Sequence, residues 1–493
     1  MFAALPDAFG ISLGYTNDPT TFKNRSTPAP STRSMACKAQ TNGRIYLHRG
    51  PRTELHEIIR QEYARHQDRA VPRNTLRQAV QGMLDTFAYQ NFDAAAGEYT
   101  NRCCRPPRET EMRPWRLVTE IGWTGGGVLA YPLVLCRDAL GADAEAPLAA
   151  AMSGEQLFDR IADAYNENSG LLNDLMAPNA AGSRVNGWWT GYGLVKDCHC
   201  AYTVGSAVHY LTKTMDYLHQ NGKPCPAKWM DAAQKVLHTV MDLQRADGAF
   251  GYTYSTQERK VLDWSGFAGC WFAPALVYLY RLTGEERCLH SAEKALDYYH
   301  TFVKDLNCYG TPMDTWKAVD EEGNLAFMRG SRLLYEQTGK AEFLQYMKDS
   351  AGYEFLWRYG YKTYPEHTPL NQGWSACGGA VTSVSNPHIH PMGVIIDTDL
   401  RYLARVTGDG YYASRAADSA AWMLQCLELY PAATGYGRYG ILSERWCPSD
   451  GLDVERFSDG RPFSSWFSHN LWASACVLEA ACELLLEIEH KKG

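Results

Sequence analysis

The stretch VYLYRLTGEERCLHSAEKALDYY, residues 277–299, decides the fold class, because one apolar helix ends within it and a second, amphipathic helix begins. The change falls at Gly284, and glycine takes the left-handed conformation at a helix C-terminus with little strain. The same threonine-glycine step recurs at Gly339 and Gly408, each between two helical patterns. So short a joint makes the two helices antiparallel. The sequence therefore predicts three helical hairpins.

Helical periodicity dominates the chain after residue 70. We predict twelve helices, at residues 73–90, 117–139, 150–168, 201–221, 226–245, 266–283, 286–304, 324–338, 341–358, 391–407, 410–428 and 466–489. Six long connections, rich in glycine, tryptophan and polar residues, lie at residues 93–116, 180–200, 247–265, 307–323, 359–390 and 430–465. Since short and long connections alternate, we expect an all-α fold, an (α/α)6 toroid of six helical hairpins. The first helix of each Thr-Gly hairpin should lie inside, and the long connections should ring one mouth.

The N-terminal 70 residues have a different character. Residues 18–34 are rich in proline, serine and threonine, and residues 42–48 read as a short strand. We therefore expect residues 1–70 to form an irregular arm or the remnant of a β-domain, and residues 71–493 to form the toroidal catalytic domain.

Composition excludes several classes of protein. The net charge of -7 and the lack of a basic stripe argue against a nucleic-acid partner. No apolar run reaches the length of about 18 residues that a membrane span needs. The N-terminus lacks the features of a signal peptide, and the 15 cysteines are odd in number and scattered, so we expect a cytoplasmic protein with buried free thiols. The oligomeric state stays open.

The hairpin that continues upstream of Gly284 carries a family resemblance. Residues 263–299, DWSGFAGCWFAPALVYLYRLTGEERCLHSAEKALDYY, resemble one hairpin of the six-hairpin glycosidase superfamily. The nearest members are uronide-active: unsaturated glucuronyl and rhamnogalacturonyl hydrolases and certain β-glucuronidases. The unsaturated-uronide hydrolases carry Arg-Gly-Gln-Ala-Trp where this chain has GFAGC at residues 266–270, which argues against their hydration chemistry.

Glycoside hydrolysis needs a carboxylic acid that protonates the leaving oxygen and usually a second carboxylate. Asp263 is our candidate for the acid, because it precedes an inner helix and the neighbouring Trp264 would raise its pKa by excluding water. Glu444, which lies among aromatic residues and arginines, is the candidate for the second carboxylate, and Asp197 is the next candidate for the acid. The structural alternatives are a helix N-cap for Asp263 and a surface ion pair for Glu444.

Two cationic clusters are candidates for binding an acidic sugar. Arg438 and Arg445, with Tyr436 beside them, flank Glu444 and suit bidentate binding of a carboxylate. The second cluster is SNPHIHP, residues 385–391, described next.

The two prolines of SNPHIHP favour an extended chain in which His388 and His390 point to the same side. The stretch ends a long connection, so we expect His388, His390 and Asn386 at the mouth, where they would donate hydrogen bonds to the substrate. The alternative is that the histidines pack beneath the connection.

Tryptophan and tyrosine present a flat apolar face with a polar edge, which matches a sugar ring. The predicted platforms are Trp188, Trp189, Trp264, Trp374 and Trp466. Packing in the core is the alternative for each of them.

Cysteines supply a rival hypothesis, because thiolates and imidazoles are good zinc ligands. Cys103 and Cys104 lie in the first long connection, and Cys198 and Cys200 in the second. Some toroidal arabinofuranosidases use a zinc-bound thiolate as nucleophile, but their motif runs in the opposite order and neither cluster here has CxxC spacing. We therefore expect no metal and no other cofactor.

These features favour an exo-acting glycoside hydrolase whose partner is a carbohydrate with an acidic sugar. A polysaccharide lyase with His388 or His390 as base stays open, as does a glycan-binding scaffold without catalysis.

Overall fold

The structure is a computed structural model. It describes residues 2–5, 8–11, 50, 54–66, 69–103, 113–116, 121, 126–174, 187–190, 193–196, 198–311, 317–362, 374–383, 386–427, 429, 440, 442–446, 468–469 and 471–490.

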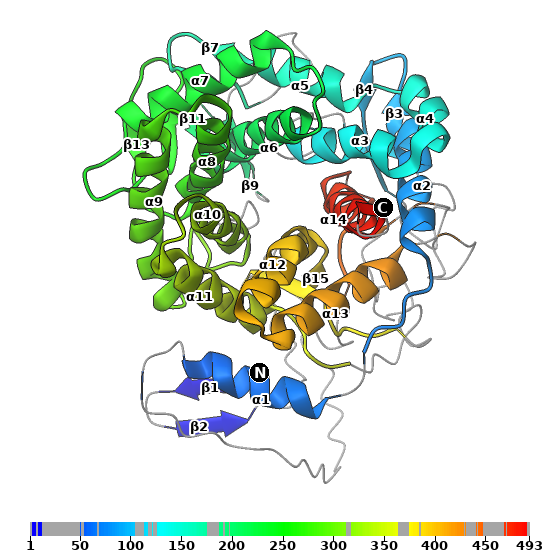
Figure 1. Cartoon of the computed structure of the whole chain (residues 1–493), viewed down its shortest axis with the longest axis vertical. Coiled ribbons are helices and arrows are strands. Elements are labelled where there is room, and N and C mark those ends of the chain that lie inside the picture. The colour runs from blue at the N-terminus through cyan, green and yellow to red at the C-terminus, as the bar shows by residue number, and fades with distance from the viewer. Residues whose placement is uncertain are drawn as a thin grey trace, which may run out of the picture.

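Six helices form a closed inner ring (Figure 1). They are α3 (Gly127–Leu140), α6 (Ala201–Gln220), α8 (Phe272–Thr283), α10 (Glu322–Thr338), α12 (Asp397–Thr407) and α14 (Leu471–His490). Each packs against the next in this order, and α14 packs against α3.

Six further helices surround this ring. They are α2 (Leu76–Thr86), α5 (Gly154–Asp163), α7 (Ala227–Asp242), α9 (Glu286–Lys304), α11 (Ala341–Trp357) and α13 (Gly410–Cys426). Each packs against one or two neighbouring inner helices, which confirms the predicted toroid of six hairpins and the predicted inner and outer places.

Single turns adjoin several of these helices. They are α4 (Glu145–Ala150), the π-turn Phe87–Asn91 and the 3-10 turns Gly141–Ala144, Ala268–Trp271 and Met392–Ile396. The helix expected at residues 117–139 begins only at Gly127, and the one expected from residue 391 begins with a 3-10 turn. These errors fall at helix starts, where apolar loop residues continue the helical pattern.

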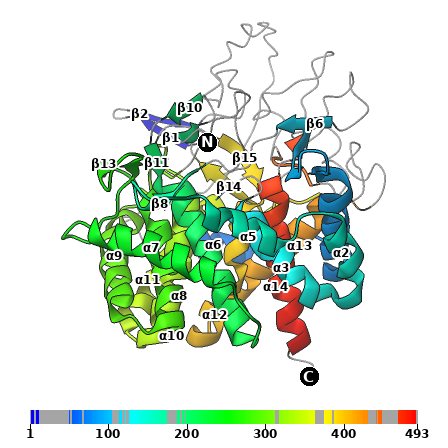
Figure 2. The same cartoon turned by 90° about the horizontal axis from the view of Figure 1, so that it is seen from above.

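Short antiparallel strands lie at one end of the toroid, where the long connections gather (Figure 2). They are β3 (Phe92–Asp93), β4 (Glu98–Tyr99), β5 (Asn101–Cys103), β6 (Arg113–Arg116), β7 (Tyr165–Asn166), β8 (Leu171–Leu172), β9 (Gly187–Thr190), β10 (Gly193–Lys196), β11 (Cys198–Cys200), β12 (Thr253–Ser255), β13 (Val261–Asp263), β14 (Ala380–Ser383), β15 (Asn386–His390) and β16 (Ser468–His469). Every inner helix follows a long connection, so all six begin at this end, which we call the mouth.

The three Thr-Gly joints are built alike. Gly284, Gly339 and Gly408 have φ of 73°, 66° and 70°, the predicted left-handed conformation. The preceding threonine donates its hydroxyl to the carbonyl four residues earlier, at 2.6–2.8 Å, and accepts the N–H two residues later, at 3.2–3.3 Å. The hydroxyl thus bonds both helices of the hairpin, which fixes their antiparallel course.

The N-terminal segment contains a helix that the sequence pattern did not predict, α1 (Leu55–Arg65). It lies outside the ring, where Arg60 donates to both carboxylate oxygens of Asp409, at 2.6 and 2.8 Å. The strands β1 (Phe2–Leu5) and β2 (Ala8–Ile11) pair near the N-terminus. The strand predicted at residues 42–48 lies outside the described residues.

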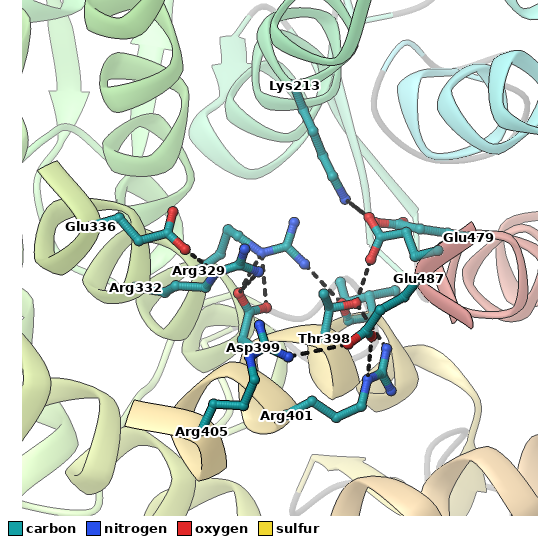
Figure 3. A network of polar contacts seen from close by, with 12 residues as sticks. Lys213, Arg329, Arg332, Glu336, Thr398, Asp399, Arg401, Arg405, Glu479 and Glu487 are labelled. Carbon is teal, nitrogen blue, oxygen red and sulfur yellow. Dashed lines mark hydrogen bonds and ion pairs between the residues drawn. The ribbon is translucent and has the colours of Figure 1, made fainter. Parts of the chain in front are cut away.

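A belt of polar contacts crosses the inside of the ring (Figure 3). We call it the inner belt, and its members are Tyr131, Lys213, Asp216, Arg281, Arg329, Arg332, Glu336, Thr398, Asp399, Glu479 and Glu483.

Glu483 of α14 is one centre of the inner belt. Lys213 of α6 lies 2.8 Å from its carboxylate, Tyr131 of α3 donates at 3.1 Å and Thr398 of α12 donates at 2.6 Å. Burial alone would raise the pKa of Glu483, but Lys213 and Arg329 lower it far below its usual value. One carboxylate therefore joins four inner helices.

Asp399 of α12 is the other centre. Arg329 of α10 donates to it through Nε at 2.8 and 2.9 Å, and Arg332 lies 3.2 Å away. Arg332 also binds Glu336, which binds Arg281 of α8 at 2.6 Å. Arg281 lies 3.5 Å from Asp216, so the chain of charges returns to α6.

No helix among the described residues is long and apolar enough to cross a membrane.

We expect Asp399→Asn to lower the free energy of unfolding by about 3–5 kcal/mol, because two buried guanidinium groups would lose their carboxylate. Urea unfolding followed by circular dichroism measures the loss. The control is Asp247→Asn, which breaks the exposed ion pair with Arg245 and should cost at most about 1 kcal/mol. Equal losses in both variants would contradict a structural role for the inner belt.

Candidate active site

One wall of the mouth is a continuous run of paired backbone. Ser383 forms a bridge with Asp320, just before α10, and β14 pairs with β15 with Ala380 opposite His390. Ile389 exchanges two hydrogen bonds with Trp446, at 2.8 and 3.0 Å. We call β14, β15 and residues 442–446 the mouth wall. It connects the start of α10 with the segment that leads to α14.

His388, His390 and Arg445 meet on the mouth wall, and their exposed fractions are 4%, 3% and 2%. Burial and the charge of Arg445 lower the pKa of both imidazoles well below the usual value, so both are neutral at neutral pH. The Nδ1 of His390 lies 3.2 Å from the carbonyl oxygen of His388, and its ring stacks at 6.1 Å on Trp472, in the first turn of α14. Neutral imidazoles can both donate and accept hydrogen bonds. The substrate-binding role of these residues, and of Asn386 in the same strand, stays a prediction.

Sequence analysis missed a buried carboxyl group at the start of α10, the helix that this wall adjoins. Glu322 occupies the first turn of α10 and is 4% exposed. It is hydrogen bonded to the hydroxyl of Tyr202, in the first turn of α6, where burial and then Glu322 raise the pKa of Tyr202. The signal was the acidic run DEEG at residues 320–323, directly at the end of a long connection, but the helix was predicted to start at residue 324.

Asp320 and Glu322 influence each other. Burial, and secondly the charge of Glu322, raise the pKa of Asp320 well above its usual value. Two N–H groups, of Thr311 and Gly323, donate to Asp320 at 3.2 and 3.3 Å, but they do not offset burial. The start of α10 therefore holds a carboxyl group that keeps its proton at neutral pH.

Asp263 does not have the environment that the sequence suggested. Its carboxylate lies 2.6 Å from the Nζ of Lys317 and accepts the N–H and the hydroxyl of Ser265, both at 2.8 Å. Although partial burial would raise the pKa of Asp263, these partners lower it. The expected rise caused by Trp264 is therefore wrong, and an ionised Asp263 is a poor proton donor. The Trp264 ring instead faces Arg245, at 5.2 Å.

Glu444 lies on the mouth wall beside Arg445 and is partly buried. Its pairing with Asp263 has no support from the topology, because Asp263 precedes α8 and Glu444 precedes α14, and these two helices lie opposite each other in the inner ring. The role of Glu444 as second carboxylate stays a prediction.

The predicted aromatic platforms have different outcomes. Trp374 is 4% exposed and belongs to the hydrophobic core, which favours packing over the predicted role as a sugar platform. Trp188 and Trp189 lie in β9, of which the backbone alone is described.

Four further predicted site residues lie outside the described residues: Asp197, Tyr436, Arg438 and Trp466.

The described cysteines give no support to a zinc site. Cys198 and Cys200 are buried in β11, and burial raises the pKa of Cys200 well above its usual value, which disfavours a thiolate. Among the described residues no group of three cysteine, histidine or acidic side chains could hold a metal. Cys103 is described in its backbone alone, and Cys104 lies outside the described residues.

Ser169, His199 and Asp174 are arranged in the manner of a hydrolase triad. The Nε2 of His199 lies 2.9 Å from the hydroxyl of Ser169, and its Nδ1 lies 3.4 Å from Asp174. All three are at most 1% exposed, and none lines the cavity beside α1. We interpret the trio as a buried network that holds β11 against residues 166–174.

Known structures share the fold. No family model and no curated protein matches this sequence. The chain is similar to the cellobiose 2-epimerase of Spirochaeta thermophila, with a TM-score of 0.53 and 13% identity over 90% of this chain and 100% of the other. It is also similar to a glycoside hydrolase family 76 mannosidase of Bacteroides thetaiotaomicron, with a TM-score of 0.51 and 14% identity over 84% and 99%.

The fold is the six-hairpin (α/α)6 toroid. At these identities the likeness extends to the fold alone.

We expect His388 and His390 to reduce stability in acid. Their folded pKa lies below the ordinary value of 6.5, so the unfolded chain binds more protons just below that pH. The stabilisation is therefore complete above pH 6.5 and decreases as the pH falls toward the folded pKa.

His388→Gln should lose less stability than the wild type as the pH falls. The midpoint of urea unfolding, measured at a series of pH values, checks this. His219→Gln, at an exposed position near the end of α6, is the control and should keep the wild-type slope. If stability falls with pH in His388→Gln as steeply as in the wild type, His388 is not a buried, neutral imidazole.

Proposed function

We propose that the protein is a glycoside hydrolase that cleaves a glycan with an acidic sugar at the mouth of the toroid. The observation that carries the proposal is the combination of Arg445, His388 and His390 on the mouth wall with a protonated carboxyl group at the start of α10. The first group of residues suits a sugar carboxylate and hydroxyls, and the second supplies the proton that glycosidic cleavage needs.

Glu322 is the proposed proton donor. Burial and the charge of Glu322 raise the pKa of Asp320 well above its usual value, so a proton is held within this carboxyl pair, and Glu322, the member bonded to Tyr202, would pass it on. The donor would transfer this proton to the leaving glycosidic oxygen. Tyr202, whose hydroxyl is bonded to Glu322, would hold the carboxyl group in position.

We assign substrate binding and the role of the second carboxylate to residues of the mouth wall. Arg445 would bind the substrate carboxylate through two parallel N–H groups, and His388 and His390 would donate to hydroxyls. Glu444, next to Arg445 in the chain, is the proposed base or nucleophile. The guanidinium group of Arg445 and the neutral imidazoles beside it suit a sugar that carries a carboxylate.

A second candidate function has its own support. Neutral imidazoles with a low pKa can accept a proton from a carbon next to a carbonyl or carboxylate group. His388 and His390 meet this condition, so proton abstraction, as in a lyase or a sugar epimerase, is the alternative chemistry. The similar folds include both a mannosidase and an epimerase, and so favour neither reaction.

We expect aryl β-glucuronides or short uronate-containing oligosaccharides to be hydrolysed and Glu322→Gln to lower kcat by about 10²–10⁴-fold, because the proton donor is lost. Glu258→Gln, at an exposed position, is the control and should leave kcat unchanged. Circular dichroism checks that both variants fold.

Product analysis separates the two chemistries. A new reducing end without ultraviolet absorbance supports hydrolysis. An unsaturated product or an epimer, formed with Glu322→Gln still active and His388→Gln inactive, would replace hydrolysis by proton abstraction. Equal turnover of neutral and acidic glycosides would contradict the acidic-sugar assignment.

A further inference from the structure

A cavity of about 540 Å³ lies outside the inner ring, between α1 and the end of α11. Its walls are formed by residues of α1, by residues 355–361 and by single residues of β14 and α13. Leu356 and Tyr361, which line it, are 37% and 46% exposed, so the cavity opens to solvent. None of the residues proposed for the active site lines this cavity.

Arg415 of α13 lines the cavity and is 1% exposed. It donates through one terminal nitrogen to the hydroxyl of Tyr411, at 3.3 Å, and through the other to the carbonyl oxygen of Arg358, at 2.7 Å. Its Nε has no hydrogen-bond partner among the described residues, and none of the described acids forms an ion pair with it. A guanidinium group has five N–H donors, so three of them are not used.

Two other buried arginines, Arg329 and Arg358, face carboxylates. Arg329 faces Asp399 at 2.8 Å, and Arg358 faces Glu354 and Asp397 at 2.8 and 2.9 Å. Arg415 instead lies over the rings of Phe355 and Tyr63, at 4.3 and 4.8 Å. Burial lowers the pKa of Arg415, as expected for a cation that has left water without a carboxylate. A buried charge in this state is costly unless an anion accompanies it.

Gly360 brings the backbone close to Arg415 and Tyr63. A Cβ atom at this position would lie 3.4 Å from a terminal nitrogen of Arg415 and 3.1 Å from the ring of Tyr63. Because Gly360 also lines the cavity, the missing side chain keeps the guanidinium group accessible from it.

We propose that this cavity is a second binding site of the protein, for a small ligand that carries one carboxylate on a ring-shaped body. The carboxylate would take two parallel N–H groups of Arg415. The proposal does not depend on the reaction at the mouth.

The charge and the walls of the cavity define the ligand class. Arg358 already faces two acids, Glu354 and Asp397, and Glu62, which also lines the cavity, pairs with Arg65. Arg415 is thus the lining arginine without an ion pair to a described acid, and its single guanidinium group matches a monoanion better than a phosphate dianion. Tyr63, Trp357 and Tyr361 line the cavity and offer flat faces to a ring. Sugar acids and aromatic acids share this chemistry, and the experiment separates them.

The test uses the full chain and two probes, sodium glucuronate and sodium benzoate, with glucuronamide and benzamide as neutral counterparts. Isothermal titration calorimetry measures binding. We expect at least one acid to bind to the wild type and its amide to bind at least tenfold more weakly, because the charge-assisted hydrogen bonds are lost. Binding of glucuronate alone assigns sugar acids, and binding of benzoate alone assigns aromatic acids.

Two variants locate the site. Arg415→Met removes the cation, and Gly360→Val fills the space beside it, so each should weaken binding at least tenfold. Gly410→Val is the matched control, since a Cβ atom at Gly410 meets no atom within 4 Å, and it should bind as the wild type does. Gly360→Val keeps Arg415, so the test stands even if Arg415→Met does not fold.

The outcomes are distinct from those for the proposed function. Failure of both acids to bind the wild type, or wild-type affinity in Gly360→Val and in folded Arg415→Met, would overturn the second site. Glu322→Gln should bind the probe at this site unchanged, so loss of hydrolysis and loss of this binding are separate results.

Discussion

The inner belt is the constraint on which the rest of the toroid depends. Helices in a closed ring leave a channel along the axis, and a channel of this kind must be filled by side chains or water. Here Glu483 and Asp399 fill it with carboxylates that reach neighbouring helices, and arginine or lysine from those helices matches them. A buried ion pair adds little net stability compared with an apolar core, but it tolerates few alternative arrangements. The register of the inner helices is therefore specified by charge.

This arrangement separates the two ends of the molecule. The inner belt and the Thr-Gly joints fix the positions of the helices, so the stability of the fold does not depend on the connections at the mouth. A rigid scaffold that presents variable loops is a common solution for binding and catalysis. The mouth wall extends this rigidity, because β14 and β15 tie His388 and His390 to the start of α10. Arg415 is an exception to the matching of buried charges, and it lies outside the ring.

Much of the fold was accessible from the sequence because its signals are local. Where an apolar helical pattern runs into threonine and glycine, the glycine ends the helix, so the three joints and the alternation of connections predicted six hairpins. The site depends on contacts between distant residues, and these have no local signal. Lys317 lies 54 residues from Asp263, yet it reverses the pKa shift that the neighbouring Trp264 suggested.

Burial accounts for the other differences from the sequence-based site. Trp374 follows a glycine in a long connection, as a sugar platform would, but it packs into the core. Glu322 was overlooked because the helix was predicted to start two residues later, which left the acidic run in a loop. His388 and His390 were located correctly at the mouth, since two prolines restrict the chain wherever it goes.

The common direction of the six inner helices has an electrostatic consequence. Each helix has the equivalent of about half a positive charge at its N-terminus, and all six N-termini lie at the mouth. Their positive ends add at the centre of the mouth, while the antiparallel outer helices bring their negative ends to its rim. The backbone alone thus makes the centre of the mouth attractive to anions at short range, although the chain as a whole has a net charge of -7, and exchanges of loop residues would leave this part of the potential unchanged. Salt would screen it from a distance of about 8–10 Å outward, so an anionic ligand should arrive more slowly as the ionic strength rises.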